Sequence, residues 1–580
     1  MTNPKNSLSS FVQSSFKGSS RFKRRLAQND ALLQNSLLGF ITGIAAALVI
    51  IGFRILFELP LRSFLPGGTP ESFESLAPIW FFTLPVLGGL VVGLWLMLFS
   101  PEHRKTGVSH VITRMAYHHG KMPFRNSVAQ FFGGALAILT GQSGGREGPA
   151  VHLGAAAGSQ IGKHFHLPNN SLRLLVGCGT AGAIAASFNT PMAGVIFAME
   201  VVMLEYTIIG FTPIIIASVT ATLLHNVLYG AEMAFMAPGI SITSLSEIPL
   251  ILVYGVILGA LAALFTKTIT AMHRFQNQPI LLRMLSAGLC TGVIAYFIPQ
   301  VMGMGTDSIL MTIQGEYAIG LLVALALAKL FATAISVGLG MPIGVIGPTL
   351  LIGACAGAAL GHISTWVLEE SSSNAGFYAL LGMGAMMSAV LQAPLAAMIA
   401  LLELTHNPNI ILPGMAIVVV ANITCSHIFK QNSVFIELLK KQGLNYKANP
   451  LDQVLSNLGV TALMDEHIVE LHDTDLQGFE SLLSKGSSWV IVTDKDKPPI
   501  RQLFHIDQFS KAITAAPVSI QDFANSAAIK SALCSSQASL KEALNLAKES
   551  DCDHLLITDT NGKVIGALAT KDILEFTQKD

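Results

Sequence analysis

The chain has 580 residues, of which 51% are hydrophobic and only 12% are charged, and its mean hydropathy is +0.57. This composition excludes an ordinary soluble protein and predicts a polytopic α-helical membrane protein. Lys plus Arg and Asp plus Glu number 35 each, so the net charge of zero indicates no nucleic-acid or other polyanionic partner.

A basic segment precedes the first apolar run, which lies near residues 37–57. The positive-inside rule therefore places the N-terminal segment, residues 1–30, in the cytoplasm. The apolar run is too long for the h-region of a signal peptide, so we expect no cleavage. We expect a multi-pass protein of the plasma (inner) membrane. The basic side chains of the segment are Lys17, Arg21, Lys23, Arg24 and Arg25.

Further apolar runs follow, near residues 79–99, 129–139 and 208–228 among others, and their lengths are uneven. Several reach the roughly 20 residues that a membrane-spanning helix needs, whereas others are about half as long. Such uneven lengths are typical of broken helices that meet inside the bilayer.

The segment from Gly141 to Gly162 reads GQSGGREGPAVHLGAAAGSQIG and carries Arg146 and Glu147 in otherwise apolar surroundings. The glycines before Pro149 predict a loop that leads into a helix N-terminus, where free N–H groups and the helix dipole favour an anion. One interpretation is that Glu147 only caps its own helix. A charged side chain at the bilayer centre costs about 2.5 to 3.5 kcal/mol, however, which favours a functional role.

An internal repeat organises the apolar part of the chain. Pro149 and Pro348 are each followed by glycines at plus 5, plus 9 and plus 13, and the Pro-to-Glu segments 191–200 and 394–403 match in length. Close packing of small residues explains the glycines but not the matched prolines and glutamates. We therefore expect two related halves that enclose a site near the midplane of the membrane.

The composition changes after about Lys441, where polar and charged residues become frequent. Two weakly similar copies follow, and each has a helix, an apolar strand, a charged turn, a second strand and a closing helix. The apolar strands are predicted at Trp489 to Thr493 and at His554 to Thr558. The expected boundaries are 1–30 for the N-terminal segment, 31–206 and 207–440 for the two transmembrane repeats, 441–458 for a linker, 459–510 for the first copy, 511–529 for a second linker and 530–580 for the second copy.

The cysteines and histidines show no spacing expected of a metal site or a disulfide framework. None of the six cysteines forms a CxxC motif, and four of them lie in apolar stretches. The sequence also lacks a nucleophile–base pairing and a cofactor loop. We therefore expect no enzymatic activity, no cofactor and no resident metal.

The motif GREGP at 145–149, its counterpart GVIGP at 344–348, the Ser109 loop and the two C-terminal copies together resemble the CLC family of chloride channels and transporters, with a C-terminal tandem pair of CBS domains. The resemblance covers residues 30–577. It implies an inverted-repeat bundle with broken helices and a lipid-embedded homodimer. Each subunit would have its own pathway for chloride and other small anions, and the CBS pair would be cytoplasmic.

The resemblance also assigns roles to site residues. Glu147 matches the gating glutamate, whose carboxylate competes with chloride and swings away when it is protonated. Ser109 matches the serine whose hydroxyl donates to chloride. Backbone dipoles can hold a dehydrated anion without the trapping effect of a full charge. The residues that match these backbone donors are Arg146, Gly148, Val345 and Ile346.

Three positions depart from the family pattern. Phe435 stands where the family has a tyrosine, which removes a hydroxyl donor to chloride and about 1.5 to 3 kcal/mol of binding. Val201 stands where proton-coupled members keep an internal glutamate, and valine carries no proton. His110 replaces a glycine of the serine loop.

These departures favour a chloride channel or a weakly coupled transporter that is gated by Glu147. The alternative is a proton/chloride antiporter in which Glu200, Glu205 or a histidine such as His110 supplies the inner proton step. A membrane scaffold without transport would need neither Glu147 nor Ser109.

The CBS resemblance leaves two roles open for the C-terminal copies. Asp572 matches a ribose-binding aspartate, but Ala569 stands where that pattern has Ser or Thr three residues earlier. Binding of an adenine nucleotide and a dimer-stabilising role are both compatible with this segment.

Overall fold

The computed structural model describes residues 26, 31–206, 208–230, 235, 240–368, 373–444, 450–472, 488–493, 501–507, 529–559 and 561–579. The basic cluster predicted to face the cytoplasm lies outside these residues. The chain divides into two compact units. The helical unit comprises Ser36–Lys163 and Arg173–Lys447, and the C-terminal unit comprises Met1–Asn35, His164–Leu172 and Ala448–Asp580.

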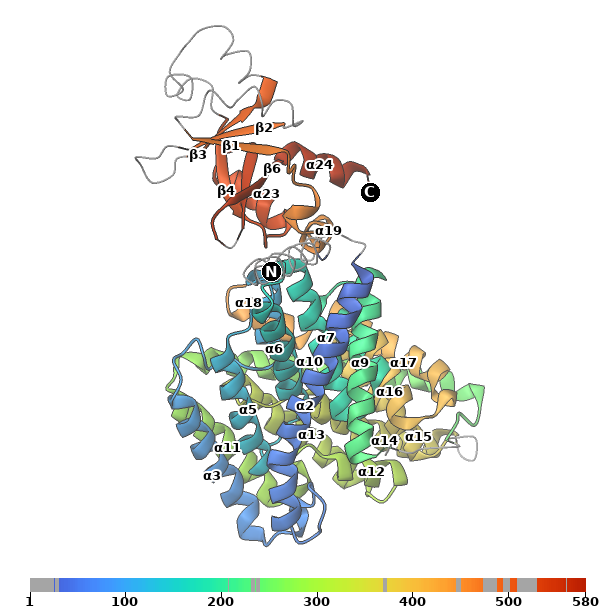
Figure 1. Cartoon of the computed structure of the whole chain (residues 1–580). Helices are drawn as coiled ribbons and strands as arrows, with labels where there is room; N and C mark the ends of the chain where they lie inside the picture. Colours follow the sequence, from blue (N-terminus) through green and yellow to red (C-terminus); the bar gives the residue numbers. More distant parts are fainter. Residues whose placement is uncertain are drawn as a thin grey trace, which may run out of the picture. The chain divides into compact units, whose positions relative to one another are not determined.

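The helical unit is built from a long series of α-helices (Figure 1). Nine helices among the described residues are long and apolar enough to cross a membrane, and α15 and α16 are among the shorter apolar ones. The predicted mixture of full and broken helices is therefore confirmed. The α-helices are α2 (Leu32–Phe64), α3 (Pro78–Met97), α4 (Gly107–Tyr117), α5 (Phe124–Leu139), α6 (Glu147–His164), α7 (Asn169–Phe188), α8 (Pro191–Phe197), α9 (Ile208–Tyr229), α10 (Ile248–Met272), α11 (Ile280–Phe297), α12 (Thr306–Gln314), α13 (Ile319–Leu339), α14 (Ile346–Leu368), α15 (Ala375–Leu391), α16 (Pro394–Thr405), α17 (Ile411–Ile423) and α18 (Val434–Lys441).

Short helical segments join these helices. Two of them have π-helical geometry and follow directly on α8 and α17, namely η2 (Ala198–Met203) and η8 (Thr424–Ile428). The remaining ones are 3-10 turns: η1 (Phe73–Ser75), η3 (Leu245–Glu247), η4 (His273–Asn277), η5 (Pro299–Val301), η7 (Pro408–Ile410) and, after the helical unit, η9 (Val460–Ala462).

The repeated glycines let backbones approach in the same way in both halves. A Cβ atom added at Gly154 would clash with the backbone of Gly179 on α7, and one added at Gly353 would clash with the backbone of Gly382 on α15. Helices α6 and α14 therefore pack tightly against the helices that follow them. This packing is the structural reason for the matched glycine spacing.

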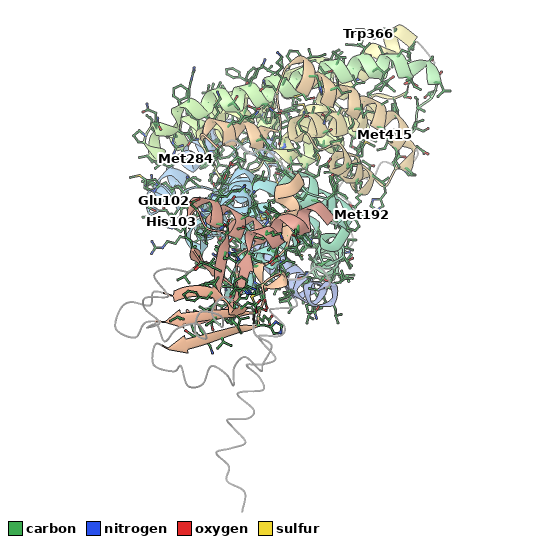
Figure 2. The ribbon with its side chains drawn as sticks, turned by 90° about the horizontal axis from the view of Figure 1, so that it is seen from above. Glu102, His103, Met192, Met284, Trp366 and Met415 are labelled. Carbon is green, nitrogen blue, oxygen red and sulfur yellow. The ribbon has the colours of Figure 1, made fainter. Side chains whose placement is uncertain are left out.

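Many large apolar side chains point outward from the helical unit. Trp366 is 73% exposed and lies at the edge of the unit in Figure 2, and Leu412 and Leu223 are 72% and 61% exposed. A soluble protein rarely exposes so much apolar surface, whereas lipid hydrocarbon covers it without cost. The exposed side chains therefore agree with a membrane-embedded bundle.

The C-terminal unit contains two three-stranded sheets of the same topology. The first has the order β1 (Ile468–His472), β2 (Trp489–Thr493), β3 (Arg501–His505), and the second has the order β4 (Ser531–Ser535), β5 (His554–Thr558), β6 (Val564–Ala569). In each sheet the first pair is parallel and the second pair is antiparallel. The two predicted apolar strands are thus confirmed as β2 and β5.

Helices complete the C-terminal unit. A parallel pair needs a crossover connection, and in the second sheet α23 (Leu540–Glu549) provides it. The other helices are α19 (Pro450–Asn457), which falls in the segment predicted as a linker, and α24 (Thr570–Lys579). Except for Ile529, the predicted second linker lies outside the described residues.

Candidate anion pathway

Two loops, one from each half, meet in the middle of the helical unit. Gly145 donates its N–H to the carbonyl of Gly344 at 2.9 Å, and Gly344 donates back at 2.6 Å. Helix α6 begins two residues after Gly145, and α14 begins two residues after Gly344. The pairing therefore brings two helix N-termini together, and their free N–H groups create a place that favours negative charge.

The carboxylate of Glu147 occupies this place. Its side chain is 1% exposed, and Oε1 accepts a hydrogen bond of 2.5 Å from the backbone N–H of Gly347 on α14. Glu147 thus does more than cap its own helix, since it is bound by the N-terminus of the opposite one. Oε2 has no hydrogen-bond partner among the described residues. A side chain at Gly344 would clash with this carboxylate, which explains the glycine.

A pocket of about 1060 Å³ leads to Glu147. The predicted site residues that line it come from four separate parts of the chain, and they are Ser109, Glu147, Gly148, Val345, Ile346 and Phe435. Helix α18, which carries Phe435, packs against α4, which carries Ser109. The structure therefore brings together the residues that the resemblance assigned to chloride, with the exception of Arg146.

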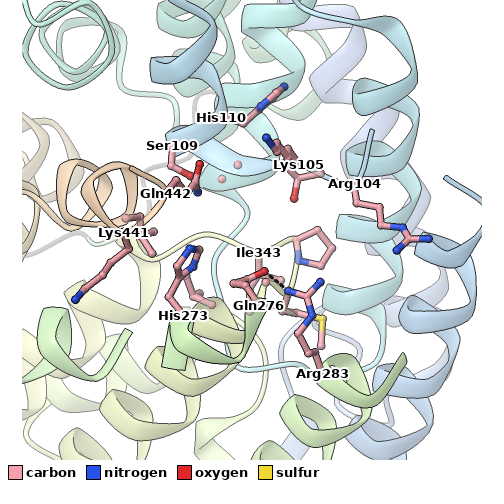
Figure 3. Close-up of a pocket in the computed structure, with 18 of the residues that line it drawn as sticks. Arg104, Lys105, Ser109, His110, His273, Gln276, Arg283, Ile343, Lys441 and Gln442 are labelled. Atoms are coloured by element: carbon pink, nitrogen blue, oxygen red, sulfur yellow. Dashed lines mark hydrogen bonds between the residues drawn. The ribbon is translucent and has the colours of Figure 1, made fainter. Parts of the chain in front are cut away.

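The described lining of the pocket is strongly basic. Five Lys and Arg residues line it, and Glu147 is the single carboxylate among the described lining residues. Low-dielectric walls of one charge sign concentrate counter-ions, so the pocket attracts anions. Figure 3 shows several of these groups around Ser109. The basic lining residues are Arg104, Lys105, Arg274, Arg283 and Lys441.

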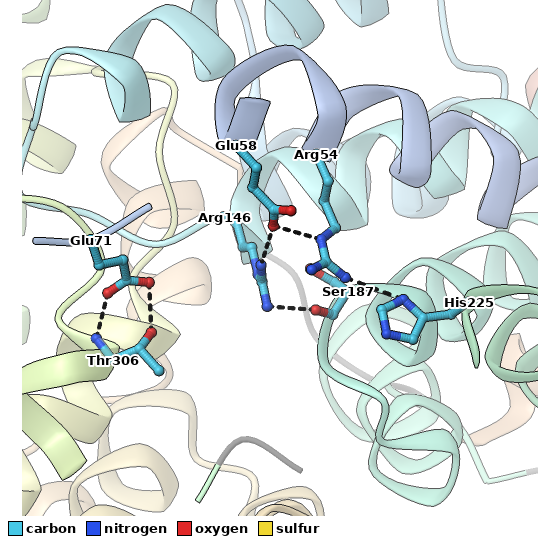
Figure 4. A network of polar contacts seen from close by, with 7 residues as sticks. All are labelled: Arg54, Glu58, Glu71, Arg146, Ser187, His225 and Thr306. Atoms are coloured by element: carbon cyan, nitrogen blue, oxygen red, sulfur yellow. Dashed lines mark hydrogen bonds and ion pairs between the residues drawn. The ribbon is translucent and has the colours of Figure 1, made fainter. Parts of the chain in front are cut away.

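Arg146 is not among the described residues that line this pocket, and its guanidinium belongs to a separate polar network (Figure 4). It contacts Glu58 at 3.3 Å and donates to the carbonyl of Ser187 at 2.6 Å. Glu58 also binds Arg54 at 2.7 Å, and Arg54 lies 3.2 Å from Nδ1 of His225. The charge of Arg146 is thus compensated by Glu58 within this network.

One buried and one half-buried ionic group near the same loops are absent from the sequence-based predictions. Lys329 is fully buried in α13 and donates to the carbonyls of Val301 and Gly303 at 3.0 and 2.7 Å. Glu71 accepts hydrogen bonds of 2.6 and 2.7 Å from the N–H and hydroxyl of Thr306, at the start of α12. A lone lysine in an apolar helix was the available signal for Lys329.

The position predicted for an internal proton acceptor holds no acidic side chain. Val201 is buried in η2. Its neighbour Glu200 accepts hydrogen bonds from the backbone N–H groups of Leu395 and Ala396 at 3.4 and 2.7 Å, and so binds the N-terminus of α16. Glu205 forms a 2.8 Å ion pair with Arg173. Both glutamates thus have structural partners.

The residue predicted to match a ribose-binding aspartate, Asp572, lies in the C-terminal unit. Asp572 is exposed in the first turn of α24, and Ala569 ends β6. The hydroxyl of Thr570 donates to the carbonyl of Asp553 at 3.1 Å.

A basic pocket that ends at paired helix N-termini inside an apolar bundle defines an anion-transporting membrane protein. Residues 88–426 match the family described as voltage gated chloride channel. The chain therefore belongs to the CLC family. It is a multi-pass membrane protein, and the function that it shares with this family is anion transport. The prediction that it is not an enzyme agrees with this membership.

Relatives and solved structures agree with this family. The chain is 30% identical to the H(+)/Cl(-) exchange transporter ClcA of Vibrio cholerae serotype O1 (strain M66-2) over 390 residues, which are 65% of this chain and 83% of that protein. It is 28% identical to ClcA of Vibrio vulnificus (strain YJ016) over 389 residues, which are 65% of this chain and 83% of that protein.

Two solved structures share the fold. The structure of a slow cyanobacterial Cl-/H+ antiporter matches with a TM-score of 0.61 and 20% identity, over 71% of this chain and 97% of the other. The structure of a eukaryotic CLC transporter matches with a TM-score of 0.57 and 18% identity, over 93% of this chain and 97% of the other.

Proposed function

We propose that this chain is a chloride transporter that exchanges chloride for protons, with Glu147 as the group that both ions use. The observation that carries the proposal is the position of the Glu147 carboxylate, which lies between two helix N-termini at the end of a basic pocket. An ionised carboxylate there occupies the place that suits an anion. Once protonated, it no longer gains from the helix dipoles and leaves the place to chloride.

Chloride in the proposed pathway enters the basic pocket and binds beside the Ser109 hydroxyl and the backbone amides at Val345 and Ile346. These donors hold the ion by dipoles, so that it binds and also leaves. Phe435 lies at the same site without a hydroxyl, and we expect weak binding there.

Exchange is preferred to free conduction because the chain is similar to proteins named H(+)/Cl(-) exchange transporters at 30% identity. This reverses the order of the two functions that the sequence alone favoured. The second candidate is an uncoupled channel, which Val201 and Phe435 favour: one cannot carry a proton, and the other weakens the hold on chloride.

The assembly and orientation belong to the same proposal. We expect a homodimer in lipid, in the plasma (inner) membrane, with the N-terminus and the C-terminal unit in the cytoplasm and with the domain boundaries predicted above. The exposed apolar side chains of Leu223 and Leu412 are suited to contact lipid or a second copy. For the C-terminal unit, a CBS pair that stabilises the dimer or binds an adenine nucleotide through Asp572 remains the expectation.

Chloride-driven proton uptake in liposomes tests the proposal. Vesicles that contain the purified protein are loaded with high chloride and diluted into low chloride at equal pH. We expect chloride efflux to drive protons inward, so that the vesicle interior becomes more acidic than the medium, and Glu147→Gln to abolish proton movement while chloride still moves. Chloride efflux without proton uptake in the unmodified protein would refute exchange and support the channel.

A further inference from the structure

Two buried histidines contact each other, one on the pocket-lining helix α4 and the other on α6, the helix that begins at Glu147. His110 on α4 is 7% exposed and His152 on α6 is 0% exposed. Their ring centroids lie 5.3 Å apart, with the rings nearly perpendicular at 86°. The structure therefore places two buried titratable side chains in contact inside the bundle.

The ring nitrogens of this pair are largely unsatisfied. Both nitrogens of His152 and Nε2 of His110 have no hydrogen-bond partner among the described residues. Buried polar atoms are nearly always paired, because a buried donor or acceptor without a partner costs stability. Two contacting histidines whose ring nitrogens lack partners therefore lower the stability of the core relative to apolar side chains. A role in proton transfer explains their presence.

The pair also joins helix α4, which contributes to the pocket, to helix α6, which begins at Glu147. His110 follows Ser109 directly and belongs to the wall of the pocket, while its ring turns away from the other labelled side chains (Figure 3). Helix α4 packs against η2, where Val201 stands at the lost proton position. His152 lies on α6 five residues after Glu147, which is about 7.5 Å along the helix axis. His110 thus lines the pocket on a helix that packs against the segment of Val201, and His152 contacts it from the helix that begins at Glu147.

The neighbouring carboxylates are less suited to the task. Glu200 is held by backbone N–H groups at the start of α16, and Glu205 is held by Arg173. The charged and titratable groups that act on His110 are Lys105, Arg114, His118 and His152. All four are neutral or positive, so none of them is a carboxylate that would hold a proton on His110.

We propose that His110 and His152 form a proton relay that replaces the carboxylate missing at Val201. A hydrated proton in the pocket protonates one ring nitrogen of His110 and leaves water behind, and a proton leaves the other nitrogen of His110 for His152. His152 accepts it on one ring nitrogen and releases a proton from the other, which reaches the Glu147 carboxylate through intervening water and converts it to a carboxylic acid. Both imidazoles end neutral, and one proton has moved. This inference rests on the proposed exchange function.

The test measures the reversal potential in liposomes under a fixed chloride gradient with an imposed pH gradient. The variants are His110→Gln and His152→Gln, which keep a similar volume and remove the titratable group. The matched control is His118→Gln, an exposed histidine at the end of the same helix. Chloride flux at equal pH reports whether each variant is folded and active.

We expect His110→Gln and His152→Gln to slow proton flux by about 100-fold, the size of a lost acid–base group, with chloride flux within about threefold of the unmodified protein. His118→Gln should keep the pH-dependent shift of the reversal potential. A carboxylate restored by Val201→Glu should rescue coupling in His110→Gln. This rescue also separates a lost relay from a damaged fold.

Two results would overturn the inference in distinguishable ways. A full pH-dependent shift in His110→Gln or His152→Gln would refute the relay and leave exchange intact. A reversal potential of the unmodified protein that ignores pH would refute exchange itself, and the relay with it.

Discussion

The buried contact of Glu58 with two arginines allows a quantitative prediction for Glu58→Gln. One carboxylate oxygen, Oε1, binds Arg54 at 2.7 Å and Arg146 at 3.3 Å, and none of the three side chains is more than 16% exposed. The guanidinium of Arg146 also lies over the ring of Phe188, 4.9 Å from its centroid. The substitution keeps the shape of the side chain and removes its charge.

Removal of one partner from a buried ion pair costs about 3–5 kcal/mol, because the other charge stays buried without compensation. Here two guanidinium groups would be left to repel each other. We therefore expect Glu58→Gln to destabilise the helical unit by about 3–5 kcal/mol. Arg146 precedes Glu147 in the chain, so chloride transport should fall as well.

The assay compares the midpoint of thermal aggregation of the detergent-solubilised protein, because a chain of two units does not unfold in one two-state step. The control is Glu575→Gln, which breaks an exposed pair with Lys571 at 3.4 Å. Such a surface pair is worth about 0.3–0.5 kcal/mol. If Glu58→Gln lowered the midpoint no more than Glu575→Gln, the argument from burial and charge would be wrong.

Three further predictions follow from single positions. Phe435→Tyr restores a hydroxyl donor worth about 1.5–3 kcal/mol, so calorimetry should show chloride binding at least about 10-fold tighter, and an unchanged affinity would refute the weak-site argument. Gly344→Ala places a Cβ 2.6 Å from the backbone nitrogen of Gly148 and closer still to the Glu147 carboxylate, so flux should stop in a folded protein. Gly320→Ala, at a helical position where a Cβ meets no atom within 4 Å, is the control, and equal flux in both variants would contradict the clash. Burial lowers the pKa of His554 below its usual 6.5, so the folded state binds fewer protons and the C-terminal unit should lose stability as the pH falls below about 6.5. The hydrogen-exchange protection of β5, corrected for the pH dependence of intrinsic amide exchange, should fall in acid, and His554→Asn should flatten this dependence; an equal acid response in the variant would assign it to other groups.

The sequence predicts those features that depend on local pattern. The start of α6 at Glu147 follows from the glycines and Pro149, because these residues define a loop and a first helical turn. The strands β2 and β5 follow from short apolar runs between turn residues. The matched glycine spacing likewise predicts the close packing around Gly154 and Gly353.

Other features depend on contacts between distant parts of the chain. The sequence shows that Glu200 and Glu403 are equivalent, but not that Glu200 binds the start of α16 while Glu403 binds the start of α8. Each of these contacts spans about 200 residues, and only the packed topology brings the partners together. The same holds for the contact between His110 and His152.

The contacts of buried charged side chains likewise cannot be predicted from the sequence alone. Composition marks Lys329 as unusual in an apolar helix, but its partners Val301 and Gly303 lie in a turn that no periodic pattern predicts. The Arg146 side chain is similar: its motif predicts the backbone site, whereas its contact with Glu58 depends on α2 lying beside it.

The most direct test of the central claim is the reversal potential of the unmodified protein in liposomes, measured under a fixed chloride gradient at several pH gradients. Exchange at Glu147 predicts a reversal potential that shifts with the pH gradient, and Glu147→Gln should return it to the chloride equilibrium value. A reversal potential that stays at the chloride value at every pH gradient would contradict the account and identify an uncoupled chloride channel.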